Sequence, residues 1–289
     1  MRNALLASLL LCSAGACIHA SVLTAYLSAP AVVATQVTGA VTEDFNSTSL
    51  LTQHSGGTDT GGVHTFNWTN GANLIGTYTA VAPTGAYIPI IAADQYGGAG
   101  GSPNQYMYVG KRNTNDATTV ELDLQTPENY FGFWWSAGDP LNVLQIYSGS
   151  VLVATFTTAD LTSFLGTSSS QNTITAISGA KYGPGGTGTY FGNPTSAFHA
   201  QDGSEPFAYV NLVASGFSFD RIVFTNNGSS GFENDNNSVY AGTLDIPDNY
   251  TAWAFVENVP VNTPEPGPMG LVAAAVAGGL AVRRRNRRA

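Results

Sequence analysis

Between residues 21 and 263 the chain consists of short apolar or alternating runs, separated by Gly, Asn, Ser, Thr and Pro. Runs of this length between turn-forming residues are typical of β-strands joined by tight turns. A helical signal is found at Thr158–Leu165, where Thr158 opens the run and Asp160 lies in its first turn. We see no internal repeat, which argues against a β-propeller or β-helix. We therefore predict one all-β domain, a β-sandwich or jelly roll, over residues 21–262.

The clearest expected element is a hairpin over Asn142–Thr157, whose turn contains Gly149. Glu128–Trp135 also alternates, and places Phe131, Phe133 and Trp135 on one face. The first segment, Val22–Thr60, has a weaker pattern and is expected to be a loosely packed extension. The remaining strands are expected at Tyr106–Val109, Thr118–Leu124, Phe207–Val213, Gly216–Thr225 and Asn249–Val256, with Phe217, Phe219, Arg221 and Val223 on one face.

Charge is distributed unevenly along the chain. Residues 21–263 contain 18 acidic and 4 basic side chains, a net charge of −14, whereas the whole chain has a net charge of −9. A surface of this kind repels polyanions and attracts cations. Nucleic-acid binding is therefore not expected. Charged residues are 10% of the chain and hydrophobic residues 43%, which excludes disorder driven by charge and also a coiled coil.

Residues 1–20 have the pattern of a secretory signal helix. Arg2 supplies a positive start, Leu5–Ile18 is apolar but short, and Ala20 precedes a more polar stretch. Cleavage after Ala16 or Ala25, an uncleaved anchor and lipoprotein processing at Cys17 are the alternatives. With cleavage after Ala20 both cysteines of the chain are removed, so the exported domain has to fold without disulfides. About 240 residues can bury enough apolar surface to do so.

The C-terminal segment 263–289 has three parts in a fixed order. Pro264-Glu265-Pro266 comes first, an apolar run over Met269–Val282 follows, and a cluster of arginines ends the segment. The run is shorter than the roughly 20 residues that cross a bilayer. It can still lodge in a membrane as a short hydrophobic helix if the arginines reach the headgroups on the cytoplasmic side. The cluster consists of Arg283, Arg284, Arg285, Arg287 and Arg288.

These three parts resemble the PEP-CTERM sorting signal of bacterial surface proteins. The resemblance implies a Gram-negative bacterium in which secretion translocon, signal peptidase and exosortase process the chain. Exosortase would cut near Pro264-Glu265-Pro266 after transient insertion of the tail helix in the inner membrane. The body would then reach the cell surface or the extracellular matrix. A plain tail anchor is the alternative.

Three segments in the second half of the chain form a further pattern. They are Glu205-Pro206-Phe207-Ala208-Tyr209-Val210-Asn211, Phe219-Asp220-Arg221-Ile222-Val223-Phe224 and Gly231-Phe232-Glu233-Asn234-Asp235-Asn236. With them, residues 95–242 resemble the body of a family of exosortase-dependent surface proteins. The resemblance brings no catalytic residue with it and supports one β-rich extracellular domain that precedes a sorted tail.

No catalytic signature is present in the sequence. A Gly-x-Ser-x-Gly elbow and a His-Glu-x-x-His motif are both missing. Glu121 and Asp123 share one face of an expected strand, and we interpret them as a solvated strand face rather than a glycosidase pair. Glu205 and Glu233 are further carboxylate candidates without better support. The histidines outside the signal segment, His54, His64 and His199, are scattered and are expected at the surface.

The segment Gly231–Asn237 is rich in carboxylate and amide groups. Calcium prefers oxygen ligands of these kinds, so Glu233 and Asp235 are candidates for a calcium site. EF-hand spacing is missing, and other loops would have to contribute. A plain Asn-rich turn is the favoured alternative. Asp94, Asp139 and Asp202 are the acidic residues that could complete such a site.

Adjacent aromatic residues on one strand point to opposite faces. One of Trp134 and Trp135 is therefore expected in the core, and the other is a candidate platform for stacking on a sugar ring. Trp68, Tyr87 and Tyr96 are weaker platform candidates. A core or edge role for all five aromatic residues is the favoured reading.

Taken together, the sequence predicts a non-enzymatic surface or matrix protein associated with exopolysaccharide in a biofilm. A carbohydrate-binding module, assisted by calcium, is the first alternative. A glycosidase or polysaccharide lyase is the second, and it would need paired carboxylates or a Tyr and Arg pair near Arg112 or Arg221. Apart from calcium, no cofactor is expected.

Overall fold

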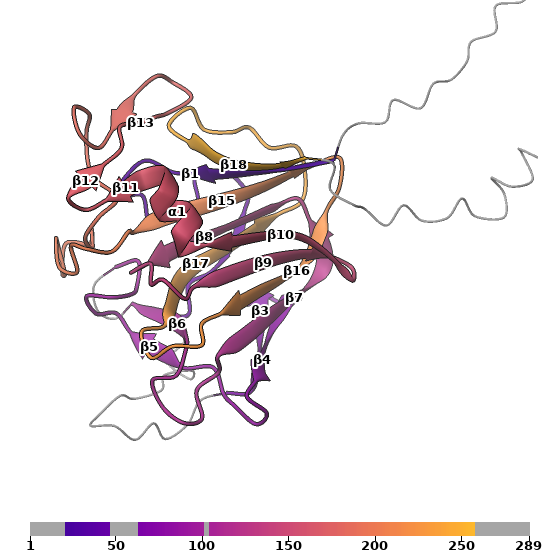
Figure 1. Ribbon diagram of the computed structural model, residues 1–289. Coiled ribbons are helices and arrows are strands. Elements are labelled where there is room, and N and C mark those ends of the chain that lie inside the picture. Colours follow the sequence, from indigo (N-terminus) through magenta and orange to yellow (C-terminus); the bar gives the residue numbers. More distant parts are fainter. Residues whose placement is uncertain (1–20, 47–62, 101–103, 258–289) are drawn as a thin grey trace, which may run out of the picture.

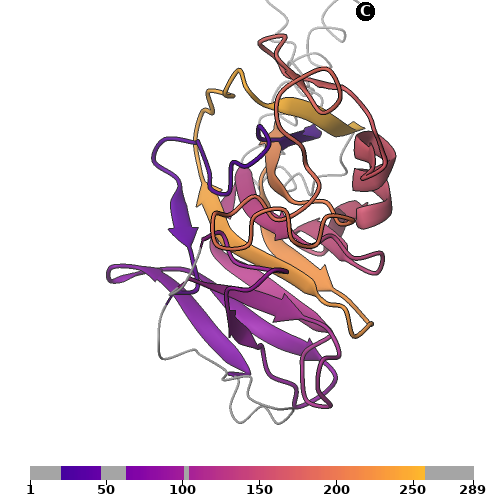
Figure 2. The same cartoon turned by 90° about the vertical axis from the view of Figure 1, so that its left-hand side faces the viewer.

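The computed structural model describes residues 21–46, 63–100 and 104–257. Two large antiparallel sheets dominate this part of the chain and pack face to face, as Figures 1 and 2 show. The predicted all-β, sandwich-like character is thus confirmed. The signal helix, the short tail helix and the sorting segment lie outside the described residues. Within the described residues, no helix is long and apolar enough to cross a membrane.

The first sheet has eight strands, in the order β18-β1-β15-β8-β17-β6-β5, with β2 paired to β17. Every strand pairing in this sheet is antiparallel. The strands are β1 (Val22–Leu27), β2 (Val41–Glu43), β5 (Ile90–Ala92), β6 (Gln105–Val109), β8 (Tyr130–Ser136), β15 (Ala208–Ser215), β17 (Phe232–Tyr240) and β18 (Thr251–Glu257).

The second sheet has six strands, in the order β10-β9-β16-β7-β4-β3. Helix α1 and two small hairpins are gathered at one end of the sandwich (Figure 1). The strands are β3 (Thr65–Asn70), β4 (Asn73–Ala82), β7 (Thr119–Glu128), β9 (Val143–Ser148), β10 (Val151–Thr157) and β16 (Phe219–Thr225). The remaining elements are α1 (Thr158–Leu165), β11 (Gly166–Thr167), β12 (Ser170–Gln171), β13 (Ile174–Thr175) and β14 (Lys181–Tyr182).

Aromatic side chains from both sheets form the centre of the core. Phe131, Phe133 and Trp135 point inward from β8, as their alternation predicts. The ring of Phe133 meets Phe224 of the other sheet edge-on, with 5.9 Å between the ring centroids, and Trp135 stacks on Phe232 at 4.9 Å. Aromatic pairs of this kind contribute about 0.5–1.5 kcal/mol each beyond the burial of their area.

Two local predictions need correction. Val22–Leu27 is no loose extension, because β1 pairs with both β15 and β18 and buries Leu23 completely. Phe219 does not share a face with Arg221. The pairing of β16 with β7 shifts register between these two residues, and Phe219 is fully buried in the core. Long-range pairing and a β-bulge are both invisible in a local pattern.

The predicted hairpin and helix are confirmed. β9 and β10 pair across a turn in which Gly149 has φ of 57°, a conformation that favours glycine. Helix α1 begins after Thr157, whose hydroxyl accepts a hydrogen bond from the backbone N–H of Asp160. The Asp160 carboxylate in turn accepts from the backbone N–H of Thr157, which completes a reciprocal cap.

Candidate functional site

A cavity of about 330 Å³ opens on the outer face of the eight-stranded sheet. Strand β6 alternates, so that Met107 and Val109 enter the core while Tyr106 and Tyr108 point outward. Glu233 is the direct neighbour of Tyr108 on β17. These two strands form the floor, and the loops that follow β5, β6 and β8 and precede β15 and β17 supply the walls. The lining residues are Tyr96, Tyr106, Tyr108, Arg112, Asp139, Glu205, Ser229, Ser230 and Glu233.

The floor is held rigidly by hydrogen bonds of the two tyrosines. The Tyr106 hydroxyl donates to Asp94 Oδ1 at 3.2 Å, and the Tyr108 hydroxyl donates to the backbone carbonyl of Ser229 at 2.9 Å. The side chains of both tyrosines are buried. The Tyr108 ring also lies against Gly231, where φ is +95° and an added Cβ would collide with the ring. Only glycine therefore suits this position.

Glu233 is the most unusual residue of the floor. Its side chain is only 4% exposed, and among the described residues its Oε2 atom has no hydrogen-bond partner. Burial raises the pKa of Glu233 well above its ordinary value, and the nearby carboxylates of Asp139 and Glu205 raise it further. A buried carboxyl oxygen without a partner is costly to a fold, and such groups often mark functional sites.

Two further carboxyl groups line the walls. Burial raises the pKa of Glu205 to about 8, and a hydrogen bond with the Asp202 side chain acts in the same direction. Burial likewise raises the pKa of Asp139 to about 6, although a hydrogen bond with Ser230 opposes the change. The cavity therefore concentrates acidic groups that are reluctant to carry their charge without a compensating partner.

The rim is polar and partly aromatic. Tyr96 is 43% exposed and Arg112 is also exposed. The Tyr96 loop is fixed by Asp94, whose Oδ1 atom accepts hydrogen bonds from the backbone N–H groups of Tyr96 and Gly97. Asn193 reaches the same loop and donates to the carbonyl of Gln95 at 3.0 Å. The exposed ring is thus presented by an ordered turn.

The structure brings together residues that the sequence offered only singly. Tyr96, Arg112, Asp139, Glu205 and Glu233 all line the cavity, and Asp94 and Asp202 contact residues that line it. Sequence analysis missed the two floor tyrosines and the two serines. The alternation of Tyr106 and Tyr108 with Met107 and Val109 was the signal that could have identified the floor.

Neither member of the tryptophan pair is a platform. Trp134 is 1% exposed and Trp135 is fully buried. Trp134 does face outward from the sheet, as expected of one of the two, but Phe207, Tyr209 and the flanking Val33 and Ala99 cover it. The platform prediction is therefore wrong for both. Of the weaker candidates, Trp68 is also buried and Tyr87 is half-buried, while Tyr96 is exposed.

The segment expected to be a calcium loop or an Asn-rich turn is a central strand. Gly231–Asn237 enters β17, and Asp235 is fully buried there. Its Oδ2 atom accepts from the N–H of Ala99 at 2.7 Å and its Oδ1 atom from the N–H of Asn236 at 2.6 Å. The predicted loop is therefore wrong, and both oxygens of Asp235 accept from backbone N–H groups; calcium binding itself stays a prediction. Among the described residues, no three metal-ligating side chains are grouped to hold an ion.

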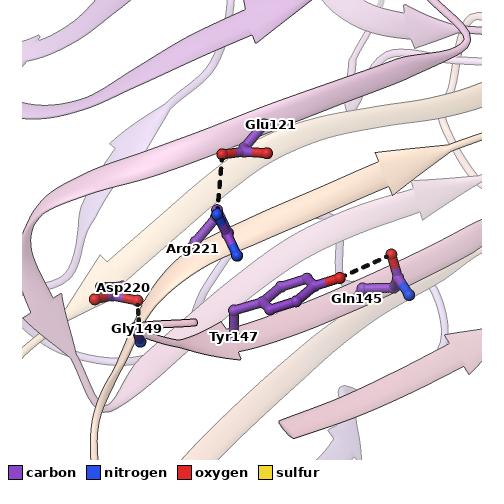
Figure 3. Close-up of polar contacts among 6 residues, drawn as sticks. All are labelled: Glu121, Gln145, Tyr147, Gly149, Asp220 and Arg221. Atoms are coloured by element: carbon purple, nitrogen blue, oxygen red, sulfur yellow. Dashed lines mark hydrogen bonds and ion pairs between the residues drawn. The ribbon is translucent and has the colours of Figure 1, made fainter. Parts of the chain in front are cut away.

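The outer face of the six-stranded sheet carries a second polar group, drawn in Figure 3. Arg221 forms an ion pair with Glu121 at 3.5 Å, and its guanidinium carbon lies 4.3 Å from the centre of the Tyr147 ring. The Tyr147 hydroxyl contacts Gln145 Oε1 at 3.4 Å. These groups satisfy one another across three strands, and Asp123 beside them is exposed. We interpret the cluster as a stabilised sheet surface.

The remaining predicted residues fall outside any site. His64 and His199 are exposed, as expected, and His64 Nδ1 lies 2.8 Å from the carbonyl of Ala86. His54 lies outside the described residues, as do Pro264-Glu265-Pro266 and the arginine cluster. Comparison with known proteins adds no relationship, because no family model, no curated protein and no solved structure matches this chain.

Proposed function

We propose that this chain is an exported surface protein of a Gram-negative bacterium, whose body binds exopolysaccharide through the cavity on the eight-stranded sheet. The observation that carries the proposal is the convergence of three tyrosines with carboxyl, hydroxyl and guanidinium groups around one opening. Carbohydrate sites combine aromatic surface for sugar rings with polar groups for hydroxyls. The volume of the cavity lies in the range of small-molecule sites, roughly 300–1,000 Å³.

The sorting half of the proposal rests on the sequence. The signal segment, Pro264-Glu265-Pro266, the apolar run and the arginine cluster together fit export followed by exosortase processing. Proline disfavours the helical conformation in the residue before it, a property that suits a segment that an enzyme has to cut. The chain would pass through the inner membrane as an intermediate and end at the cell surface or in the matrix.

A binding role fits the cavity better than catalysis. A lyase would use a tyrosine as base, but burial raises the pKa of both Tyr106 and Tyr108 well above the usual range. Their hydroxyls are also engaged with Asp94 and with the Ser229 carbonyl. Neutral, engaged phenols serve recognition rather than proton abstraction. We therefore propose a non-enzymatic protein.

Retention of the full-length chain, in mild detergent, on the organism's own exopolysaccharide tests this function. We expect saturable retention that falls about three- to tenfold in Tyr96→Ala, because the exposed ring at the rim is removed. Phe255→Ala is the matched control, since Phe255 is 62% exposed on the opposite edge of the sheet. Absence of retention, or equal loss in both variants, would refute a role for the cavity.

A further inference from the structure

We propose that the cavity recognises a protonated amino group, and that its ligand is an amino-sugar unit of a polysaccharide with free amines. This inference rests on the proposed function and names the class of sugar that it would bind. Three carboxyl groups and three tyrosine rings surround one opening, and both kinds of group attract an organic cation.

Glu233 supplies the strongest argument for a cationic ligand. Its Oε2 atom is buried in the cavity floor and has no partner among the described residues. Because burial favours the protonated form of Glu233, an ammonium group entering the cavity would donate the missing hydrogen bond and stabilise the ionised carboxylate, which releases its proton to solvent on binding. A neutral hydroxyl could donate the bond but would not stabilise the charge. The Glu233 carboxyl destabilises the unbound protein, and it would stabilise the complex with a cationic ligand.

The walls add to the same preference. Asp139 and Glu205 line the cavity beside Glu233, so that three carboxyl groups face one guanidinium, that of Arg112. Arg112 is exposed at the rim, where solvent and salt screen its charge. The balance within the cavity is therefore acidic, which agrees with the net charge of the domain.

The size and rim of the cavity favour an amine carried on a sugar. An opening of about 330 Å³ exceeds the space that a bare metal ion needs. Ser229 and Ser230 at the rim are exposed hydroxyls, and the exposed Tyr96 ring can cover one face of a sugar. Calcium would need six to eight oxygen ligands around one point. An ammonium needs only a few acceptors and benefits from the rings.

Calorimetric titration of the full-length chain with matched oligosaccharides tests the inference. The probes are a glucosamine oligomer, its fully N-acetylated counterpart, a glucose oligomer of equal length, and Ca²⁺ alone. We expect the glucosamine oligomer to bind at least tenfold more tightly than the other two sugars. We also expect Glu233→Gln and Glu205→Gln each to weaken that binding about tenfold or more. Melting curves establish that the variants are folded.

Asp123→Asn is the matched control, because it removes the same charge from an exposed position on the other sheet. Equal weakening in Asp123→Asn and Glu233→Gln would mean diffuse attraction to an acidic surface and would overturn the inference. Equal affinity for acetylated and free-amine oligomers would also overturn it but would leave the proposed function intact. Competition by Ca²⁺ at stoichiometric concentration would likewise overturn the inference and leave the proposed function intact. Failure of every sugar to bind would refute the inference, whereas retention on the organism's own exopolysaccharide decides the proposed function separately.

Discussion

A carboxyl group that is almost fully buried normally has a hydrogen-bond partner on each oxygen, and Glu233 departs from this rule. The buried, unpaired carboxyl destabilises the folded state, because burial and two neighbouring carboxylates disfavour its charged form. At the scale of single residues, the acidic cavity therefore lowers the free energy of unfolding of the protein. Ligand binding is the physical reason that we offer for this cost.

The stability of the protein should depend on pH through Glu205. Its pKa rises from an ordinary 4.5 to about 8 on folding, because it is buried and faces Asp202 and Asp139. The folded state holds the proton more tightly, so stability is greatest below about pH 4.5 and falls as the pH rises to 8. Glu205→Gln should flatten this slope. Half-exposure of Glu205 limits the gain at pH 8 to about 1 kcal/mol, or roughly 2–4 °C in melting temperature.

Melting temperatures measured from pH 4 to pH 9 would check this expectation. Asp139 and Asp235 also have raised pKa values, so the stability of the Glu205→Gln variant will still decrease partly as the pH rises. Identical slopes in the wild-type protein and Glu205→Gln would contradict the assignment. Asp123→Asn again serves as the control, since its carboxylate is exposed.

At the scale of elements, the alternation of apolar and polar residues was sufficient to predict a strand wherever that strand has one apolar face. The hairpin of β9 and β10, the inward row of β8 and the cap of α1 all follow from local pattern. Strand β17 could not be predicted in this way. Its sequence, Phe232–Tyr240, is largely polar. Asn234, Asn237 and Asp235 form hydrogen bonds with the distant partners Met107, Tyr78 and Ala99, respectively. Polar residues of this kind indicate a loop unless the partners are known.

Asp235 links β17 to the loop that precedes β6. Replacement by Ala would leave the buried N–H groups of Ala99 and Asn236 without their acceptor. We expect a loss of about 1–3 kcal/mol in the free energy of unfolding. We also expect faster hydrogen exchange at the Ala99 amide. Asp235→Asn keeps one acceptor oxygen and should cost less. Equal stability of wild type and Asp235→Ala in denaturant would contradict this role.

The candidate site depends still more on tertiary structure. Its lining residues come from separate segments between Tyr96 and Glu233, and the pairings of β6 with β17, β17 with β8 and β8 with β15 bring them together. Sequence alone could identify acidic and aromatic candidates, but it could not choose among them. Trp134 shows why: a strand face can be outward and still be covered by loops. Exposure, unlike alternation, is a property of the whole fold.

At the scale of the whole molecule, the cavity lies at the corner of the eight-stranded sheet opposite to Val22 and Glu257. Glu257 ends β18 and pairs with Val22 at one edge, whereas the cavity lies over β17 and β6 near the other. Five strand spacings, roughly 24 Å, separate β18 from β6. The register also places Glu233 at the end of the strands opposite to Val22. The sorting segment that we propose after Glu257 would therefore begin at the corner of the sheet opposite to the cavity.

We expect the proposed sorting tail to act independently of the cavity, because Glu257 lies at the opposite corner of the sheet. Replacing Arg283, Arg284, Arg285, Arg287 and Arg288 together by Gln should impair membrane orientation and processing, because the positive-inside signal is lost. A blot of cell fractions should show unprocessed chain accumulating, while ligand binding by the purified protein stays unchanged. Normal processing of this variant would contradict a role for the cluster in sorting.

The central claim is that the cavity, and no other surface, contacts the polysaccharide. Hydrogen–deuterium exchange of the full-length chain with and without the exopolysaccharide tests it most directly. We predict new protection confined to the segments around Tyr96, Tyr106–Arg112, Glu205 and Ser229–Glu233. Protection of the Arg221 and Tyr147 face of the six-stranded sheet instead, with the cavity segments unchanged, would contradict the account.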